Sequence, residues 1–260
     1  MTNDFLYQTE SGIKVNFRFF DSLESTNKTA KELALSGADE GTVIVANAQT
    51  GGRGRLGRSF YSPAGTGLYF SIILRPDFAP NQNLLITPAA AVAVSRAIES
   101  VAGINTNIKW VNDIFANGKK VCGILSESVL DSSGKTQYII LGIGINLTPP
   151  KGGFPADIKN IAGTVLPAPD KEKETEILKQ TVNNFFKYYS DLSNPKIFTE
   201  YDIRLMLKGQ KVGYTQNGIL NEGTVLGVSP DFNLIIKKEN EDIIHLSSGE
   251  VTIGSKTAIK

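Results

Sequence analysis

The chain has 260 residues, a formal net charge of +1, one histidine and one cysteine. The near-neutral balance argues against a general nucleic-acid-binding protein. One histidine and one cysteine also argue against a zinc site and against hydrolases that use a serine or cysteine triad. A single cysteine forms no internal disulfide, and the N-terminus lacks the layout of a signal peptide. No apolar run approaches a membrane span, so we expect a cytoplasmic protein that does not bind membranes.

The first predicted elements are a strand and a helix. Residues 15–20 alternate apolar and polar side chains, which is typical of a half-buried strand. Ser25 is a suitable N-cap for a helix that continues to Leu35. The neighbouring Thr26 and Asn27 leave two interpretations open. The three polar residues cap the helix, which the sequence favours, or they form a cluster of neutral donors and acceptors for an amide or ureido group.

A loop of glycines and arginines at residues 49–60 separates two predicted strands, at residues 42–46 and 68–74. Residues 52–57 match the Gly-x-Gly-x-x-Gly dinucleotide-binding pattern, but that pattern requires a following helix. Pro63 and later glycines oppose such a helix. The sequence contains no Walker A motif either. Arginines so close together are costly to confine without an anion, so we predict a loop that closes and becomes ordered over a negatively charged ligand.

Polar residues follow a long apolar helix predicted at residues 84–101. Lys109, Asn112 and Asp113 stand close together at a strand edge. One interpretation is a set of polar turn residues before a hairpin at Asn117-Gly118. The other places an ammonium group and a metal-binding carboxylate at one site, as phosphoryl or nucleotidyl chemistry requires.

Two further strands are predicted at residues 119–129 and 137–147. Cys122 in the first has no basic neighbour in sequence that would activate its thiol, so we interpret it as a small core residue. Gly142 and Gly144 in the second fall on one face. They provide either a flat patch for a planar group or room for close helix packing.

The remaining chain contains predicted helices at residues 171–190 and 195–206, followed by short strands from residue 211 to residue 253. These strands predict a small SH3-like β-barrel. We therefore divide the chain into a catalytic domain at residues 1–207 and a C-terminal SH3-like domain at residues 208–260. His245 is expected to point outward from a late strand. We predict no chemistry in this C-terminal module.

Five blocks, at residues 23–27, 52–58, 109–113, 120–125 and 142–146, resemble the ordered signature set of biotin protein ligases. The resemblance covers nearly the whole chain, and the arginine–glycine loop is specific to that family. The chain departs from the usual pattern at Val111 (commonly proline), Cys122 (commonly alanine) and Phe60 (tryptophan in some members). The resemblance implies an α+β fold with a mixed β-sheet packed with helices, of the class II synthetase-like type shared with lipoate ligases.

The resemblance also implies the reaction. ATP, with Mg2+, activates biotin to biotinyl-5′-AMP, and a lysine of a biotin carboxyl carrier protein domain then takes the biotinyl group. The predicted catalytic strand begins near Val15 and leaves no room for an N-terminal DNA-binding domain. We therefore expect the monofunctional type, with no DNA binding. The sequence does not distinguish a monomer from a homodimer.

The resemblance assigns site residues by position. Those that bind biotin are Ser25, Thr26, Asn27, Gln49, Arg53, Gly54, Arg55, Lys120 and Gly123. Those that bind ATP or the adenylate are Arg55, Arg58, Phe60, Asn112 and Asn146. Arg55 and Lys109 are the predicted catalytic residues, and Asp113 is the predicted metal residue.

Two other functions compete with this assignment. A lipoate or octanoate ligase of the same fold accepts a flexible acyl chain and does not need the Arg53-Gly54-Arg55 closure. A nonenzymatic biotin- or nucleotide-binding module explains a polar pocket, but not a basic loop combined with Lys109 and Asp113.

Overall fold

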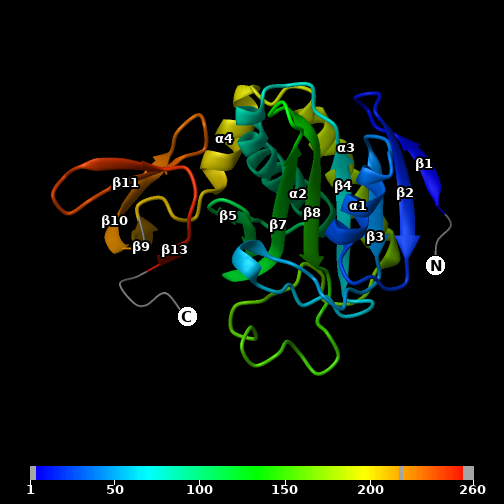
Figure 1. Cartoon of the computed structure of the whole chain (residues 1–260). Coiled ribbons are helices and arrows are strands. Elements are labelled where there is room, and N and C mark those ends of the chain that lie inside the picture. Colours follow the sequence, from blue (N-terminus) through cyan, green and yellow to red (C-terminus); the bar gives the residue numbers. More distant parts are fainter. Residues whose placement is uncertain (1–3, 217–218, 254–260) are drawn as a thin grey trace.

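The structure is a computed structural model that describes residues 4–216 and 219–253, and its main part is one eight-stranded sheet (Figure 1). The strands are β1 (Phe5–Gln8), β2 (Lys14–Phe20), β3 (Thr42–Ala46), β4 (Gly67–Leu74), β5 (Asn107–Lys109), β6 (Asp113–Ala116), β7 (Lys119–Leu130) and β8 (Thr136–Asn146). They lie in the order β1-β2-β3-β4-β8-β7-β6-β5. β2 and β3 are parallel and the other neighbouring pairs are antiparallel, which confirms the predicted mixed sheet.

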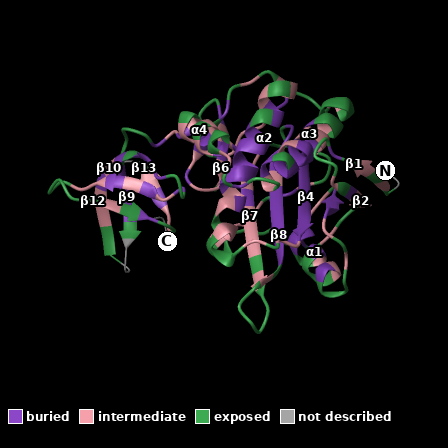
Figure 2. Cartoon of the chain, turned by 90° about the horizontal axis from the view of Figure 1, so that it is seen from above, coloured by how far each residue is buried: buried purple, intermediate pink, exposed green. Residues whose placement is uncertain are grey.

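Helices cover both faces of this sheet. α1 (Thr26–Leu35) packs Ala30 and Ala34 against one face. α2 (Ile86–Ala102) and α3 (Lys171–Tyr189) contribute to the large core on the other face (Figure 2). Every residue of β3 and β4 is therefore buried, which explains why these strands read as nearly continuous apolar runs.

The structure corrects two expectations about the first half of the chain. β1 was not predicted, because it is a four-residue edge strand with no clear alternation and depends on pairing with β2. The segment Pro80–Ala102 is long and apolar enough to cross a membrane by length and composition, contrary to our expectation. In the fold its α2 part is a core helix, with residues such as Val92 and Ile98 fully buried.

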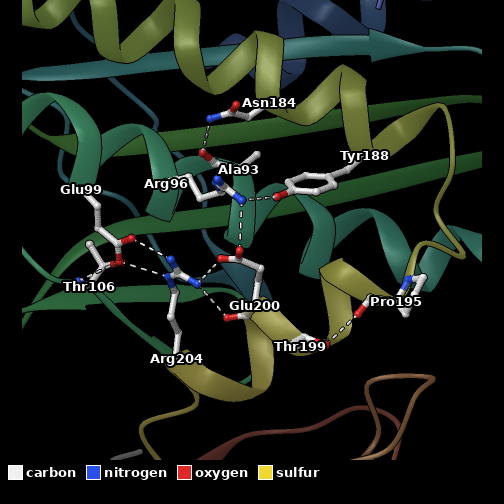
Figure 3. A network of polar contacts seen from close by, with 10 residues as sticks. All are labelled: Ala93, Arg96, Glu99, Thr106, Asn184, Tyr188, Pro195, Thr199, Glu200 and Arg204. Carbon is white, nitrogen blue, oxygen red and sulfur yellow. Dashed lines mark hydrogen bonds and ion pairs between the residues drawn. The ribbon is translucent and has the colours of Figure 1, made fainter.

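A polar network fastens α4 (Pro195–Arg204) to α2 (Figure 3). Arg204 Nη2 lies 2.7 Å from Glu99 Oε2 on α2, and Arg204 Nη1 lies 2.6 Å from Glu200 Oε2 on its own helix. Just after α4, the Met206 N–H donates to the Ile108 carbonyl of β5 at 3.0 Å. The network thus holds the strand that ends at Lys109 in place.

The C-terminal module is a five-stranded antiparallel sheet, consistent with the predicted SH3-like domain. Its strands are β9 (Lys211–Gln216), β10 (Ile219–Val228), β11 (Leu234–Lys237), β12 (Ile243–Leu246) and β13 (Val251–Ile253), in the order β12-β11-β10-β9-β13. His245 is exposed on β12, as predicted. The division at residues 207/208 falls between α4 and β9 and stays a prediction.

The two modules share one hydrophobic core, which includes Trp110 of the first and Phe232 of the second. The Trp110 indole N–H donates to the Phe232 carbonyl at 2.8 Å. The Phe232 ring also packs edge-on against Tyr201 of α4, with centroids 5.1 Å apart. These contacts fix the C-terminal module beside β5 and β6.

Candidate active site

A pocket lies at the N-terminus of α1, between the arginine–glycine loop and strands β7 and β8. Most of the predicted site residues line it: Ser25, Thr26, Asn27, Gln49, Arg53, Gly54, Arg55, Arg58, Phe60, Asn112, Asp113, Lys120 and Gly123. Lys109 and Asn146 lie outside this lining. Lys109 ends β5, and Asn146 lines a neighbouring pocket.

The helix start is capped in a way that the sequence did not predict. Ser25 has extended N-cap geometry, but its side chain makes no capping hydrogen bond. The side-chain oxygen of Gln49 instead accepts the Thr26 N–H at 2.8 Å and the Thr26 hydroxyl at 3.1 Å. Ser25 is therefore the N-cap residue by position, as predicted, but a residue from the loop after β3 provides the side-chain hydrogen bond that Ser25 was expected to make. Ser25 is 2% exposed and lines the pocket.

The glycines of β7 and β8 give the pocket one of its walls. A Cβ on Gly142 would collide with Asn27 Oδ1, so only glycine allows this asparagine to lie against the strand. A Cβ on Gly144 would lie 2.6 Å from the Phe60 ring, and one on Gly123 would lie 3.2 Å from it. The predicted flat patch therefore does hold a planar group at Gly144. This group is the Phe60 ring, which lies against the strand beside the polar residues.

Two of the three arginines in the loop have side-chain partners within the protein. The Arg55 guanidinium donates to Asn112 Oδ1 at 3.0 Å and to the Gly249 carbonyl at 3.3 Å. Arg58 forms an ion pair with Glu250 at 2.8 Å. Glu250 is thus one anionic partner from the protein itself, and the loop contains the short 3-10 helix η1 (Arg55–Gly57). Closure of the loop over a ligand anion stays a prediction.

The same contacts bring the C-terminal module to the pocket, where the sequence indicated no role for it. Glu250 lies just before β13 and lines the pocket, and the Arg58–Glu250 bond joins residues 192 positions apart. No local pattern marks Glu250 in the sequence, since its importance arises only from the docking of the two modules.

A lysine and a carboxylate pair on the opposite side of the pocket. Lys120 Nζ lies 2.7 Å from Asp113 Oδ1. Nearby, burial lowers the pKa of the Lys109 ammonium from its ordinary value, while the Asp113 carboxylate opposes this shift and Lys120 adds to it. Within the part of the chain that is described, no group of three or more His, Cys, Asp or Glu side chains could hold a metal ion.

A second, smaller pocket adjoins the first and shares Ser59, Phe60 and Lys120 with it. Asn146 and the apolar side chains of Phe154, Ile158, Ile161 and others complete its lining. Phe60 therefore separates a pocket with a neutral polar end from one with apolar walls. This arrangement suits a ligand with two unlike parts joined near the basic residues.

Cys122 takes no part in this chemistry. It is fully buried, and burial raises the pKa of its thiol, so the interpretation as a small core residue is confirmed. Sequence analysis missed Ser71 and Glu127, whose side chains bond to Asn27. Ser71 lies within an apolar strand and Glu127 near the end of another, and neither position forms a motif.

Comparison with known proteins agrees with the geometry. Residues 19–146 match the model of the biotin/lipoate A/B protein ligase family. The bifunctional ligase/repressor BirA of Bacillus subtilis is 38% identical over 244 residues, which cover 91% of this chain and 73% of that protein. The biotin–[acetyl-CoA-carboxylase] ligase of Mycobacterium tuberculosis is 28% identical over 210 residues, covering 77% of this chain and 76% of that protein.

Solved structures give the same result. The biotin protein ligase of Aquifex aeolicus in complex with biotin and ATP superimposes with a TM-score of 0.73 and 29% identity. The superposition covers 92% of this chain and 99% of that chain. Sequence similarity over most of both proteins and agreement of the folds show that the chain belongs to the biotin protein ligases of the biotin/lipoate ligase family.

Proposed function

We propose that this chain is an ATP-dependent biotin–protein ligase, which activates biotin to biotinyl-5′-AMP and transfers the biotinyl group to a lysine of a biotin carrier domain. The observation on which this rests is a pocket that is lined by neutral polar side chains at the start of α1 and by three arginines from the loop. Biotin has the matching chemistry, with an uncharged ureido ring at one end and a carboxylate at the other.

The neutral end of the pocket binds the ureido ring. Ser25, Thr26 and Asn27 gather at the start of α1, where Gln49 fixes Thr26 through two hydrogen bonds. Hydroxyl and amide groups both donate and accept, so they match a ring with one carbonyl and two N–H groups. The apolar Phe60 and the glycine strip then border the path toward the arginine loop.

The basic residues act in the activation step. A carboxylate oxygen of biotin attacks the α-phosphorus of ATP, the bond to the bridging oxygen breaks, and pyrophosphate leaves. Two anions approach each other in this step, so fixed cations at the reacting atoms lower the barrier. We assign this role to Arg55, Arg58 and Lys120, which line the pocket, and to Lys109, whose ammonium group is near Asp113 and Lys120.

Transfer needs no general base from histidine. The ε-amine of the carrier lysine attacks the acyl carbon of the mixed anhydride, AMP leaves and the amine loses its proton. Fixed hydrogen-bond donors such as the Arg55 guanidinium stabilise the charge that develops on the phosphate and the acyl oxygen. The second pocket, with Asn146 and Phe60, is our proposed location for the adenylate.

The donor set at Asp113 fits a magnesium ion that arrives with the nucleotide. Mg2+ in nucleotide enzymes is commonly bound by one or two carboxylates, water and substrate phosphates. Asp113 is the carboxylate we propose, and it lies beside the Asn112 amide, with Lys120 as its present partner. Bound there, the ion would neutralise phosphate charge.

One assay tests the function against its rivals. The purified protein is incubated with ATP, Mg2+, a biotin carrier domain and either biotin or lipoate, and the carrier mass is measured. We expect the mass of one biotinyl group on the carrier and none with lipoate. Lipoylation would favour the acyl-ligase alternative, and tight biotin binding without any modification would favour a binding module.

The carrier, assembly and location are narrower parts of the proposal. The name of the mycobacterial relative indicates acetyl-CoA carboxylase as its substrate protein, and we propose the carrier domain of such a carboxylase as the partner here. A monomer or homodimer, a cytoplasmic location and the lack of DNA binding stay predictions. Light scattering and a gel-shift assay with biotin and ATP would test assembly and DNA binding.

A further inference from the structure

Asn27 at the polar end of the pocket is held between two residues that do not line it. Its side-chain nitrogen donates to Glu127 Oε2 on β7 at 2.7 Å. Its side-chain oxygen accepts from the Ser71 hydroxyl on β4 at 2.6 Å. Asn27 is 5% exposed and Ser71 is fully buried, so water is largely excluded as a replacement partner.

The carboxylate of Glu127 determines which way the Asn27 amide faces. A carboxylate accepts hydrogen bonds and donates none, so the amide nitrogen must point toward Glu127. A flipped amide would bring two acceptor oxygens together in a largely buried place, which is costly. The amide oxygen is therefore directed at Ser71, whose hydroxyl donates to it.

This orientation sets the direction of the next hydrogen bonds. The Ser71 hydroxyl also donates to the Thr26 hydroxyl oxygen at 2.8 Å, so its one hydrogen is shared between Asn27 and Thr26. The Thr26 hydroxyl donates to Gln49 Oε1, and the Gln49 amide nitrogen in turn donates to Ser62 Oγ at 2.9 Å. Each side chain in this network, from Glu127 at one end to Ser62 at the other, therefore has a fixed role as donor or acceptor.

We propose that Glu127 is a positioning residue that fixes the donor and acceptor pattern of the biotin pocket through Asn27. This inference rests on the proposed function. Glu127 lies on the same face of β7 as Gly123 and Leu125, which line the pocket, and it pairs in register with Ile140 beyond the pocket end. Glu127 therefore acts on the ligand only through its hydrogen bond with Asn27.

The fixed arrangement of donors and acceptors determines which ligand the pocket binds best. A cyclic urea presents a carbonyl between two N–H groups and satisfies oriented hydroxyl and amide partners. A dithiolane such as that of lipoate offers no donor of this kind and leaves the remaining hydrogen-bonding capacity of Ser25, Thr26 and Asn27 unused. Sites of this type reject analogues that lack the hydrogen-bonding groups far more strongly than apolar pockets do.

The test compares Glu127→Ala, which removes the acceptor, with Glu127→Gln, which retains a side-chain oxygen. Steady-state biotinylation of a carrier domain gives kcat and the KM values for biotin and ATP, and thermal unfolding checks folding. We expect Glu127→Ala to raise the biotin KM about 10- to 100-fold, with kcat and the ATP KM within about 2-fold. Glu127→Gln should restore the biotin KM to within about 3-fold. Glu172→Ala, at an exposed position on α3, is the matched control for loss of a carboxylate.

A double-mutant cycle completes the test. In an Asn27→Ala background, Glu127→Ala should have little further effect, because Glu127 acts through Asn27. An unchanged biotin KM in Glu127→Ala, or equal losses in biotin KM, ATP KM and kcat that Gln does not rescue, would overturn the positioning role. Wild-type protein is measured in parallel, and a wild type that does not biotinylate the carrier would instead overturn the proposed function.

Discussion

At the scale of single residues, the pocket depends on a glycine that admits a polar side chain. A Cβ on Gly142 would collide with Asn27 Oδ1, and Asn27 is held by Ser71 and Glu127 and has little freedom to move. We expect Gly142→Ala to weaken biotin binding at least about 10-fold in calorimetry, through displacement of the amide. Gly213→Ala in the C-terminal module serves as the control, and wild-type affinity in Gly142→Ala would contradict this account.

Lys109 combines a proposed catalytic role with a cost in stability. Because burial lowers the pKa of its ammonium, the charged form is disfavoured in the folded protein. Lys109→Met should slow adenylate formation about 100-fold, leave biotin affinity within about 2-fold, and leave the Tm equal or higher. The rate is measured in single turnovers by pyrophosphate release.

The pH dependence of stability provides a second check on Lys109. Its folded pKa lies below the unfolded one, so the unfolded chain binds more protons between the two values. The stability deficit of wild type relative to Lys109→Met is therefore full below the folded pKa and shrinks as pH rises toward the ordinary value of 10.5. A difference that stays constant or grows in denaturation at rising pH would contradict the buried-charge explanation.

At the scale of secondary-structure elements, α4 depends on Arg204 for its attachment to α2. Burial alone would raise the pKa of Glu99, but hydrogen bonds from Arg204 and Thr106 bring it below its ordinary value. Arg204→Met leaves Glu99 and Glu200 without this partner, and we expect a loss of about 3 kcal/mol at pH 7, or about 5–10 °C in Tm. Arg96→Met removes a more exposed pair to the same Glu200 and should cost under about 1 kcal/mol.

The pH dependence of stability provides a separate test of the ion pair between Arg204 and Glu99. A carboxyl group with a depressed folded pKa stabilises the protein above its unfolded pKa, and that contribution disappears as pH falls through the folded value. The stability difference between wild type and Arg204→Met should therefore narrow below about pH 4.5. Urea denaturation at pH 7 and pH 4 measures it, and an equal difference at both values would refute the Glu99 contribution.

At the scale of the whole molecule, the C-terminal module restrains the arginine loop through Glu250. Trypsin cleaves after arginine, so the loop contains its own reporters at Arg53, Arg55 and Arg58. In ligand-free protein, Glu250→Ala should increase cleavage within the loop about 2- to 5-fold, as expected for loss of an exposed ion pair. Fragments are quantified by mass spectrometry. Glu239→Ala removes an ion pair with Lys211 in the same module, and trypsin should cleave the loop of this variant at the wild-type rate.

Local patterns predicted most of the strands and helices, because strand alternation, helix spacing and loop composition are properties of neighbouring residues. The mixed sheet and the gathering of residues 25–27 with the arginine loop were implied by the resemblance to biotin protein ligases and not by any local pattern. The Asn27–Glu127 bond spans 100 positions and the Arg58–Glu250 bond spans 192. Such contacts are set by how elements dock, so no window of sequence could show them. The Gln49 cap was missed for the same reason.

The position of Glu250 also bears on how the protein is handled in the laboratory. Glu250 contacts the loop at the pocket, only three residues before Ile253, the last residue of β13. A purification tag or fluorescent protein joined a few residues after β13 is therefore tethered near the pocket, where a bulky carrier domain has to bind. The edge strand β1 lies at the opposite end of the sheet from β5 and the C-terminal module (Figure 1). Fusions are therefore best placed at the N-terminus.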